Sequence, residues 1–202
     1  MIVIIDHGFA NLKSIYSAIK FLKYPVIISS KYKEIKNSTA LILPGVGNFG
    51  RVMNSLKKKK IIDALNEEVL LKNKKVLGIC LGCQILLQSS EESYGELGLG
   101  WIKGKCIKFK KKNFSTNHTG WNQVNLVKNI FLTKIPTSFM MYFNHSFYPV
   151  LENKNEVISY TQYSHSFASI FQKKNIFGIQ PHPEKSQRYG LILLKQFIEH
   201  AS

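Results

Sequence analysis

The first half of the chain repeats a short apolar run that ends at a turn and is followed by a segment with helical spacing. Three of these runs, at residues 2–5, 40–43 and 76–79, are followed at once by DHG, by PGVG and by a cysteine. Such strand–helix alternation predicts a parallel sheet with helices on both faces. Because parallel strands end at the same edge of a sheet, we expect the three turns to lie together and a functional site to lie at that edge.

Apolar spacing places further elements along the chain. It predicts helices over residues 11–22, 52–56, 61–72 and 188–200, and a strand over residues 25–29. The second half is richer in strands, with candidates at residues 106–109, 123–126, 139–143, 157–163, 169–171 and 176–180. No internal repeat, low-complexity linker or domain boundary is evident. We therefore predict one α/β domain over residues 1–202, built on an open mixed, largely parallel sheet flanked by helices.

The composition argues against several classes of protein. No apolar run approaches the roughly 20 residues that span a membrane, and the start lacks a signal-peptide pattern. Three cysteines do not suggest a disulfide framework, so we expect a cytoplasmic protein. The formal net charge of +16 comes from lysine, since only Arg51 and Arg188 are arginines. Nucleic-acid recognition prefers arginine, so solvated lysine-rich faces are favoured; a basic module that binds RNA or acidic protein without catalysis is the alternative.

Residues 76–88, VLGICLGCQILLQ, place Cys80 between a predicted strand and a helix-compatible segment over residues 84–88. The G-x-C-x-G pattern resembles a nucleophile elbow, where glycines allow a sharp turn close to the strand. A helix N-terminus just beyond the cysteine favours thiolate over thiol, which predicts covalent chemistry through Cys80. The competing interpretation is a redox pair, because Cys80 and Cys83 form a C-x-x-C motif; a zinc site on these cysteines lacks a second close ligand pair.

A cysteine nucleophile needs a base and a group that orients the base. His182 follows an apolar strand, and Glu184 lies two residues on, where an extended segment places it on the same side. The competing histidines are His145 and His165, without a nearby carboxylate, and, in predicted loops, His7 and His118. Acyl transfer also needs donors for an oxyanion. The Leu81 amide and the PGVG turn are candidates, although PGVG could equally be an ordinary strand-to-helix connection.

The motifs GICLGCQ, LPGVG and HPEKS, in this order and spacing, resemble those of class I (triad-type) glutamine amidotransferases. The match covers nearly the whole chain, and DHGFANLKSI, GWN and MYFNHSFYP are similar to one branch in particular, the glutaminase subunits of imidazole glycerol phosphate synthase in histidine biosynthesis. The resemblance implies the flavodoxin-like sheet of that family and a heterodimer, and it implies neither a cofactor nor a metal.

By this resemblance, Cys80 forms a γ-glutamyl thioester with glutamine, and His182, oriented by Glu184, protonates ammonia and then activates water. The further matching positions are, for the oxyanion hole, Gly47 and Leu81; for glutamine, Gln84 and Glu92; and for the partner interface, Asn11, Trp121, Asn122 and Lys185. Without the resemblance, Trp121 would be interpreted as a core or loop aromatic.

The resemblance also implies a partner. Ammonia would pass to a separate (β/α)₈-barrel cyclase subunit, which converts a phosphoribulosyl imidazole-carboxamide nucleotide (PRFAR) into imidazole glycerol phosphate and AICAR. The chain departs from the family pattern at His7, Ala10, Cys83, Asn144 and Pro181, none of which is a triad member. Within the enzyme class, the alternative is therefore a paralogue that supplies ammonia for amidation of a surface-polysaccharide sugar.

Overall fold

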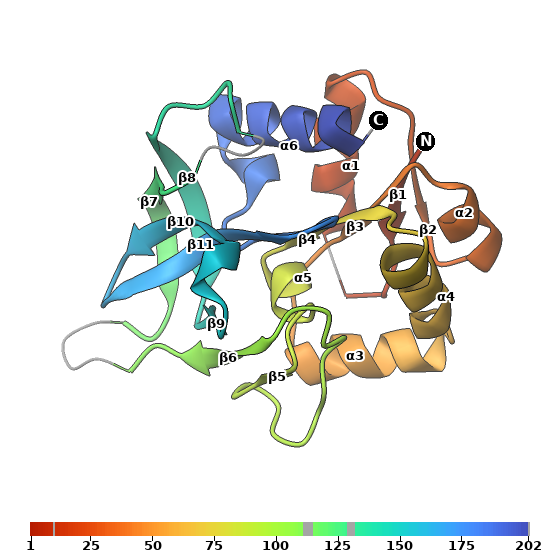
Figure 1. The fold of residues 1–202 in the computed structure, drawn as a ribbon, viewed down its shortest axis with the longest axis horizontal. Helices are drawn as coiled ribbons and strands as arrows, with labels where there is room; N and C mark the ends of the chain where they lie inside the picture. The colour runs from red at the N-terminus through yellow and green to blue at the C-terminus, as the bar shows by residue number, and fades with distance from the viewer. Residues whose placement is uncertain (10, 111–114, 129–131, 202) are drawn as a thin grey trace.

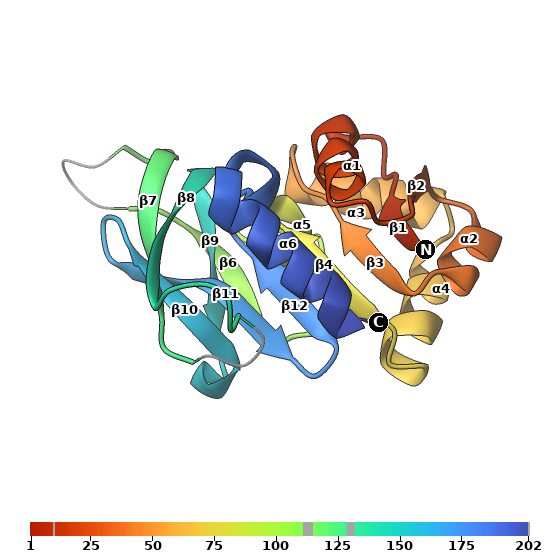
Figure 2. The same cartoon turned by 90° about the horizontal axis from the view of Figure 1, so that it is seen from above.

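The computed structural model describes residues 1–9, 11–110, 115–128 and 132–201, and Figures 1 and 2 show its arrangement. Its strands are β1 (Ile2–Ile5), β2 (Val26–Ser29), β3 (Ala40–Leu43), β4 (Lys75–Ile79), β5 (Ser89–Ser90), β6 (Gly104–Lys108), β7 (His118–Leu126), β8 (Ser138–His145), β9 (Phe147–Leu151), β10 (Val157–Gln162), β11 (Ser166–Lys173) and β12 (Ile176–Ile179). Its α-helices are α1 (Leu12–Phe21), α2 (Tyr32–Asn37), α3 (Phe49–Lys58), α4 (Ile62–Asn66), α5 (Leu81–Gln84) and α6 (Gln187–Ala201). Three short non-α turns are η1 (Glu67–Leu71), η2 (Lys154–Glu156) and η3 (Pro183–Lys185).

Nine of these strands form one mixed sheet in the order β2-β1-β3-β4-β12-β11-β10-β7-β8. Neighbouring strands from β2 to β12 are parallel, and those from β12 to β8 are antiparallel. A smaller sheet pairs β6 with β5 and β9. The predicted open mixed sheet flanked by helices is confirmed, and its parallel half carries the three turns that the sequence pattern places at one edge.

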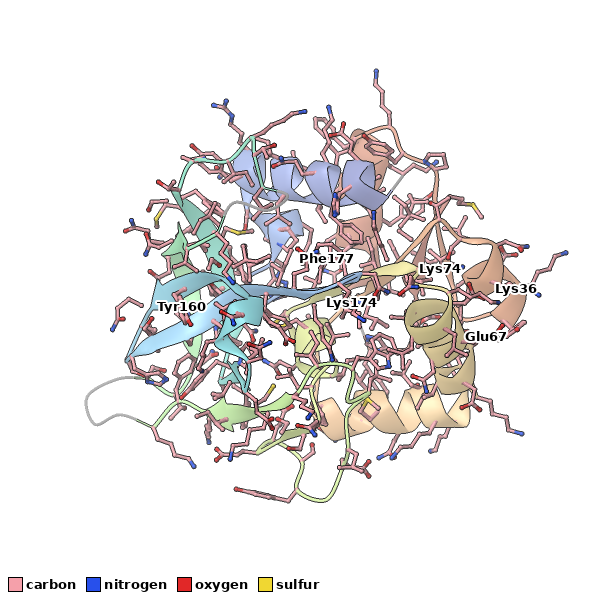
Figure 3. All side chains as sticks on the ribbon, in the orientation of Figure 1. Lys36, Glu67, Lys74, Tyr160, Lys174 and Phe177 are labelled. Atoms are coloured by element: carbon pink, nitrogen blue, oxygen red, sulfur yellow. The ribbon has the colours of Figure 1, made fainter. Side chains whose placement is uncertain are left out.

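Helices cover both faces of the parallel strands. Helices α1 and α6 lie over one face, and α3 and α4 lie on the other (Figures 1 and 2). The whole of β1 is buried for this reason: Ile2 and Ile4 belong to the core beneath α1 and α6, and the alternate residues belong to the core beneath α3. Phe177 of β12 packs against Phe197 of α6, with ring centroids 5.3 Å apart (Figure 3).

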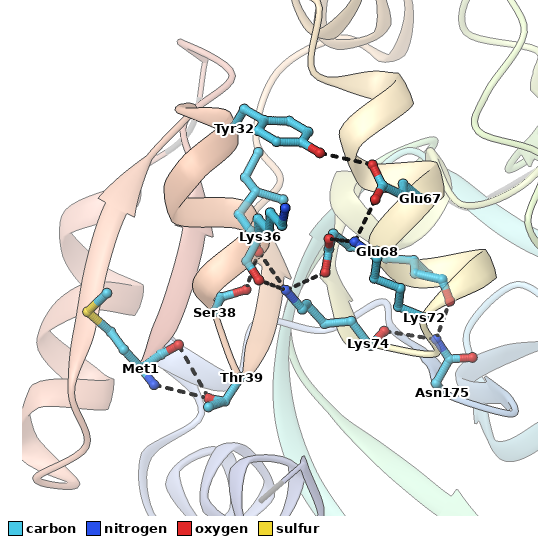
Figure 4. A network of polar contacts seen from close by, with 12 residues as sticks. Met1, Tyr32, Lys36, Ser38, Thr39, Glu67, Glu68, Lys72, Lys74 and Asn175 are labelled. Atoms are coloured by element: carbon cyan, nitrogen blue, oxygen red, sulfur yellow. Dashed lines mark hydrogen bonds and ion pairs between the residues drawn. The ribbon is translucent and has the colours of Figure 1, made fainter.

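A polar network ties the amino ends of β4 and β12 to α2 and η1 (Figure 4). Glu68 is 2% exposed and pairs with Lys72 and Lys74, each at 2.7 Å. The Lys74 ammonium also donates to the carbonyl oxygens of Ile35 and Lys36, and the Asn175 amide donates to those of Val69 and Lys74. A buried carboxylate needs such partners, so this network holds the end of the sheet opposite the three turns.

Most predicted elements are present, and several details differ. The helix expected over residues 84–88 is instead the single turn α5, which starts directly after Cys80. The helix expected over 61–72 begins as α4 and continues as the wider π turn η1. His118 is not in a loop but begins β7. Helix α2 and strands β5 and β9 have no predicted counterpart; in β9, Pro149 removes a backbone donor, which weakens the sequence signal for a strand. Among the described residues, no helix is long and apolar enough to cross a membrane.

Candidate active site

Cys80 stands at a sharp elbow between β4 and α5. Its backbone has φ +52° and ψ −111°, a conformation that residues with a side chain rarely adopt. The Cys80 amide donates to the Ile179 carbonyl at 2.7 Å, so the elbow stays attached to β12. Strained backbone that is held this firmly is typical of functional sites, and a nucleophile elbow uses it to expose the reactive atom.

Glycines allow the elbow to touch the PGVG loop, residues 44–47, backbone to backbone. A Cβ on Gly82 would lie 1.9 Å from the Leu43 carbonyl oxygen, and one on Gly45 would lie 2.1 Å from the Gly82 nitrogen. Neither contact is possible for a residue with a side chain. The glycines at these two positions are therefore required by close approach, and they bring the Leu81 amide beside the PGVG loop.

His182 and Glu184 lie together next to this elbow. The His182 Nδ1 atom is 2.8 Å from Glu184 Oε1, and both side chains are almost fully buried. This leaves Nε2 as the ring nitrogen that can interact with the Cys80 sulfur. Burial alone would lower the pKa of His182, but the Cys80 sulfur and the Glu184 carboxylate outweigh it and raise that pKa to about 10. The arrangement therefore favours an imidazolium beside the sulfur, as a nucleophilic thiolate requires.

The backbone around His182 is fixed by the neighbouring strand. The His182 amide donates to the Tyr142 carbonyl at 2.8 Å, and the Ser186 hydroxyl donates to the His182 carbonyl at 2.6 Å. Ser186 also accepts from the Tyr142 amide at 3.0 Å. Because β8 and the segment after β12 hold one another in this way, the imidazole has little freedom to leave the sulfur.

The Cys80 side of the elbow opens into a cavity of about 240 Å³. The sequence-predicted residues in its wall are Cys80, Gly47, Leu81, Gln84 and Glu92; the others are Gly45, Val46, Asn117, Asn144, His145, Ser146 and Phe147. The Glu92 carboxylate accepts from the Phe49 amide at 2.7 Å, at the start of α3. Burial raises the pKa of Glu92, and the bond from the Phe49 amide opposes that shift. The cavity thus joins a sulfur nucleophile to a fixed carboxylate.

The site predictions did not include several residues that lie close to the Cys80 sulfur. The 144–147 segment joins β8 to β9, and the Asn144 carbonyl lies 3.8 Å from the Cys80 sulfur. Gln180 is fully buried, and its amide nitrogen lies 3.6 Å from the same sulfur. A signal for Gln180 was present, because residues two apart in an extended segment share a side and Gln180 precedes His182 by two. The 144–147 segment lies within the motif MYFNHSFYP, but only the fold shows that it reaches Cys80.

Two of the four predicted interface residues lie beside the triad, and a third is linked to them through Tyr142. Asn11 and Lys185 border the same narrow gap as His182 and Glu184. The Lys185 ammonium lies 5.6 Å from the centre of the Tyr142 ring, which in turn meets Trp121 edge-on at 6.2 Å. Trp121 is 45% exposed and lines a pocket of about 350 Å³ with Met140 and the start of α6, so it is not a core aromatic.

Asn122 and Cys83 have more internal roles. The Asn122 amide donates to His118 and to the Gln162 carbonyl, at 3.0 and 2.9 Å. Cys83 is fully buried, and burial raises the pKa of its thiol well above the ordinary value. A buried thiol of this kind is inert, which argues against a redox role for the C-x-x-C motif. No group of three or more histidine, cysteine or acidic side chains in the described part of the chain is placed to hold a metal.

Comparison with known proteins agrees with this geometry. The profile of the family described as glutamine amidotransferase class-I matches residues 3–200. The chain is 46% identical to imidazole glycerol phosphate synthase subunit HisH of Buchnera aphidicola, covering 98% of both chains, and 42% identical to subunit HisH 2 of Methanococcus maripaludis, covering 100% of both. Among solved structures, PurLQS from Thermotoga maritima has a TM-score of 0.79 at 16% identity, covering 100% of this chain and 98% of that one, a likeness of fold. The chain therefore belongs to the class I glutamine amidotransferase family and, within it, to the HisH subunits of imidazole glycerol phosphate synthase.

Proposed function

We propose that this chain hydrolyses glutamine to glutamate and ammonia through a thioester on Cys80. The observation that carries the proposal is the buried Cys80–His182–Glu184 arrangement, whose Cys80 lines the same cavity as Glu92. A carboxylate there suits the α-ammonium of an amino acid, and a cavity of about 240 Å³ suits a small substrate.

We propose the following sequence of steps. The Cys80 sulfur attacks the carbon of the glutamine carboxamide, and the developing oxyanion accepts hydrogen bonds from the Leu81 amide and from the PGVG loop at Gly47. The His182 Nε2–H then gives its proton to the leaving nitrogen, so that ammonia departs and the thioester forms. In the second half, His182 takes a proton from water, and the hydroxide releases glutamate. Glu184 holds the imidazole through Nδ1 in both halves.

The ammonia needs an acceptor, and the HisH relationship supplies one by inference. We propose a (β/α)₈-barrel cyclase subunit as the heterodimeric partner, with PRFAR converted to imidazole glycerol phosphate and AICAR. We propose Asn11, Trp121, Asn122 and Lys185 as part of the contact, because Asn11 and Lys185 lie beside the triad and Trp121 is an exposed tryptophan, a residue enriched at interfaces. We place this activity in the cytoplasm, where the precursors of amino-acid biosynthesis are made.

Transfer of labelled nitrogen tests the proposal. The chain, reconstituted with the cyclase subunit from the same source, is given glutamine labelled with ¹⁵N in the side-chain amide, together with PRFAR and excess unlabelled ammonium. We expect the label in imidazole glycerol phosphate with little dilution, because ammonia passes between the subunits without entering the solvent. Absence of labelled product with an active cyclase would refute the function, and full dilution of the label would refute direct passage between the subunits.

A further inference from the structure

A continuous chain of hydrogen bonds links the outer strands of the sheet to the substrate cavity. His118 at the start of β7 and His145 at the end of β8 are register partners, and their rings meet with His118 Nδ1 at 3.0 Å from His145 Nε2. Both side chains are buried, at 3% and 6% exposure. Neither histidine takes part in the proposed chemistry, although His145 lines the cavity.

The donor and the acceptor of each hydrogen bond in this series can be assigned from the groups at its two ends. The Phe147 carbonyl can only accept, so the His145 Nδ1 atom, 2.8 Å away, must carry the hydrogen. In a neutral ring His145 Nε2 then accepts, and His118 Nδ1 must be the donor. His118 Nε2 accepts in turn from the Asn122 amide at 3.0 Å. The second hydrogen of that amide goes to the Gln162 carbonyl.

At its other end, this series of hydrogen bonds reaches the Cys80 sulfur. The Phe147 carbonyl also accepts from Gln84 Nε2 at 2.8 Å, and the second hydrogen on this nitrogen goes to Gln180 Oε1 at 3.0 Å. This fixes the amide of Gln180 with its nitrogen toward the Cys80 sulfur, at 3.6 Å. Both hydrogens of Gln84 are thereby committed within the protein, so the atom that its amide can offer to a ligand is the acceptor Oε1, which suits a substrate ammonium.

We propose that His118 and His145 are positioning residues for the glutamine site: they hold the Phe147 carbonyl, and through it Gln84 and the 144–147 wall, in the geometry that binds glutamine. The proposal rests on the proposed function. It requires both rings to be neutral, since a proton on His145 Nε2 would set two N–H groups against each other. Burial supplies this condition, because it lowers the pKa of His118 to about 4 and that of His145 to about 3.

Two variants of His145 separate positioning from packing. His145→Phe keeps a ring of similar size but loses both hydrogen bonds, whereas His145→Asn keeps an amide donor near the place of Nδ1 and within reach of the Phe147 carbonyl. In the reconstituted complex, His145→Phe is expected to raise the KM for glutamine roughly fivefold to tenfold, the effect of one lost hydrogen bond, with kcat within about twofold. His145→Asn should recover most of that loss. Phe167→Leu is the matched control, because Phe167 packs against both rings without bonding to them.

A KM for His145→Phe within about twofold of wild type, or an equal rise in Phe167→Leu, would overturn the proposal. The tautomers provide a second test that needs neither activity nor a variant. Long-range ¹H–¹⁵N spectra of the isolated protein at pH 7 should show both rings neutral with the hydrogen on Nδ1. A hydrogen on Nε2 of either ring would refute the proposed series of hydrogen bonds. A wild-type complex that forms no product from glutamine would refute the proposed function. The tautomers would still show whether the proposed series of hydrogen bonds exists.

Discussion

Acidification should destabilise this protein through His118 and His145. Both rings are buried, and burial lowers their pKa values from 6.5 to about 4 and about 3. In the unfolded chain both regain their ordinary pKa, so between pH 6.5 and pH 4 the unfolded state binds more protons than the native state. The free energy of unfolding therefore falls as the pH falls through this window.

The size of the effect depends mainly on the unfolded state. At pH 5 an unfolded histidine of pKa 6.5 is almost fully protonated, whereas both native rings are still neutral. Each buried ring therefore lowers the free energy of unfolding at pH 5 by about 2 kcal/mol, and the pair lowers it by about 4 kcal/mol. Since a typical domain is stable by about 5 to 15 kcal/mol, this loss should be easy to measure. The raised pKa of His182 acts in the opposite direction, because its stabilisation is fully present below pH 6.5 and is lost as the pH rises through about 10.

Urea unfolding at pH 7.5 and pH 5.0 measures how the free energy of unfolding depends on pH. Variants of each histidine isolate the contribution of its ring. His145→Asn and His118→Asn should each reduce the stability lost between the two pH values by about 2 kcal/mol, whatever they cost at pH 7.5. Phe167→Leu, which removes packing but no titrating group, should keep the wild-type pH dependence, and the contribution of His182 cancels in each comparison. If either histidine variant loses as much stability on acidification as wild type does, that ring is not held neutral in the native protein, and the reasoning fails.

Three further substitutions test the geometry of the site. Gly82→Ala forces a Cβ against the Leu43 carbonyl and should lower the free energy of unfolding by about 2 to 4 kcal/mol. The control Gly95→Ala, at φ +82° in open space, should lower it by only about 1 to 2 kcal/mol. Equal losses of the two variants in urea unfolding would contradict the close approach at Gly82. Cys83→Ser should retain most of the glutaminase activity of the complex, and a loss as deep as that of a Cys80 variant would restore the redox interpretation. Glu92→Gln keeps an acceptor for the Phe49 amide but removes the charge, so steady-state kinetics should show about a tenfold higher KM for glutamine with little change in kcat; an unchanged KM would remove Glu92 from the site.

Much of the site could be predicted because its residues follow strands whose ends must meet. The apolar runs before Cys80 and His182 identify β4 and β12, which are neighbours in the sheet, and Glu184 lies within a short turn of His182. The same argument places the PGVG loop at this edge. These inferences need only local periodicity and the rule that parallel strands share an end.

The wall opposite the elbow could not be predicted in this way. The 144–147 segment reaches Cys80 only because β8 and β9 belong to different sheets, a tertiary fact that no local pattern encodes. From the sequence, His118 is expected in a loop, yet it lies in β7, where it is the register partner of His145 and is buried. Nothing in the residues around His118 indicates a bonding partner that lies 27 residues away.

The central claim is that Cys80 acts only in the release of ammonia from glutamine, and that a partner subunit uses this ammonia for the synthesis of imidazole glycerol phosphate. Cys80→Ala tests it most directly, in the reconstituted complex with PRFAR and either glutamine or ammonium as the nitrogen source. We expect glutamine-dependent formation of imidazole glycerol phosphate to vanish while ammonium-dependent formation continues at the wild-type rate. Retention of glutamine-dependent synthesis, or loss of both activities in a complex that still assembles, would contradict this account.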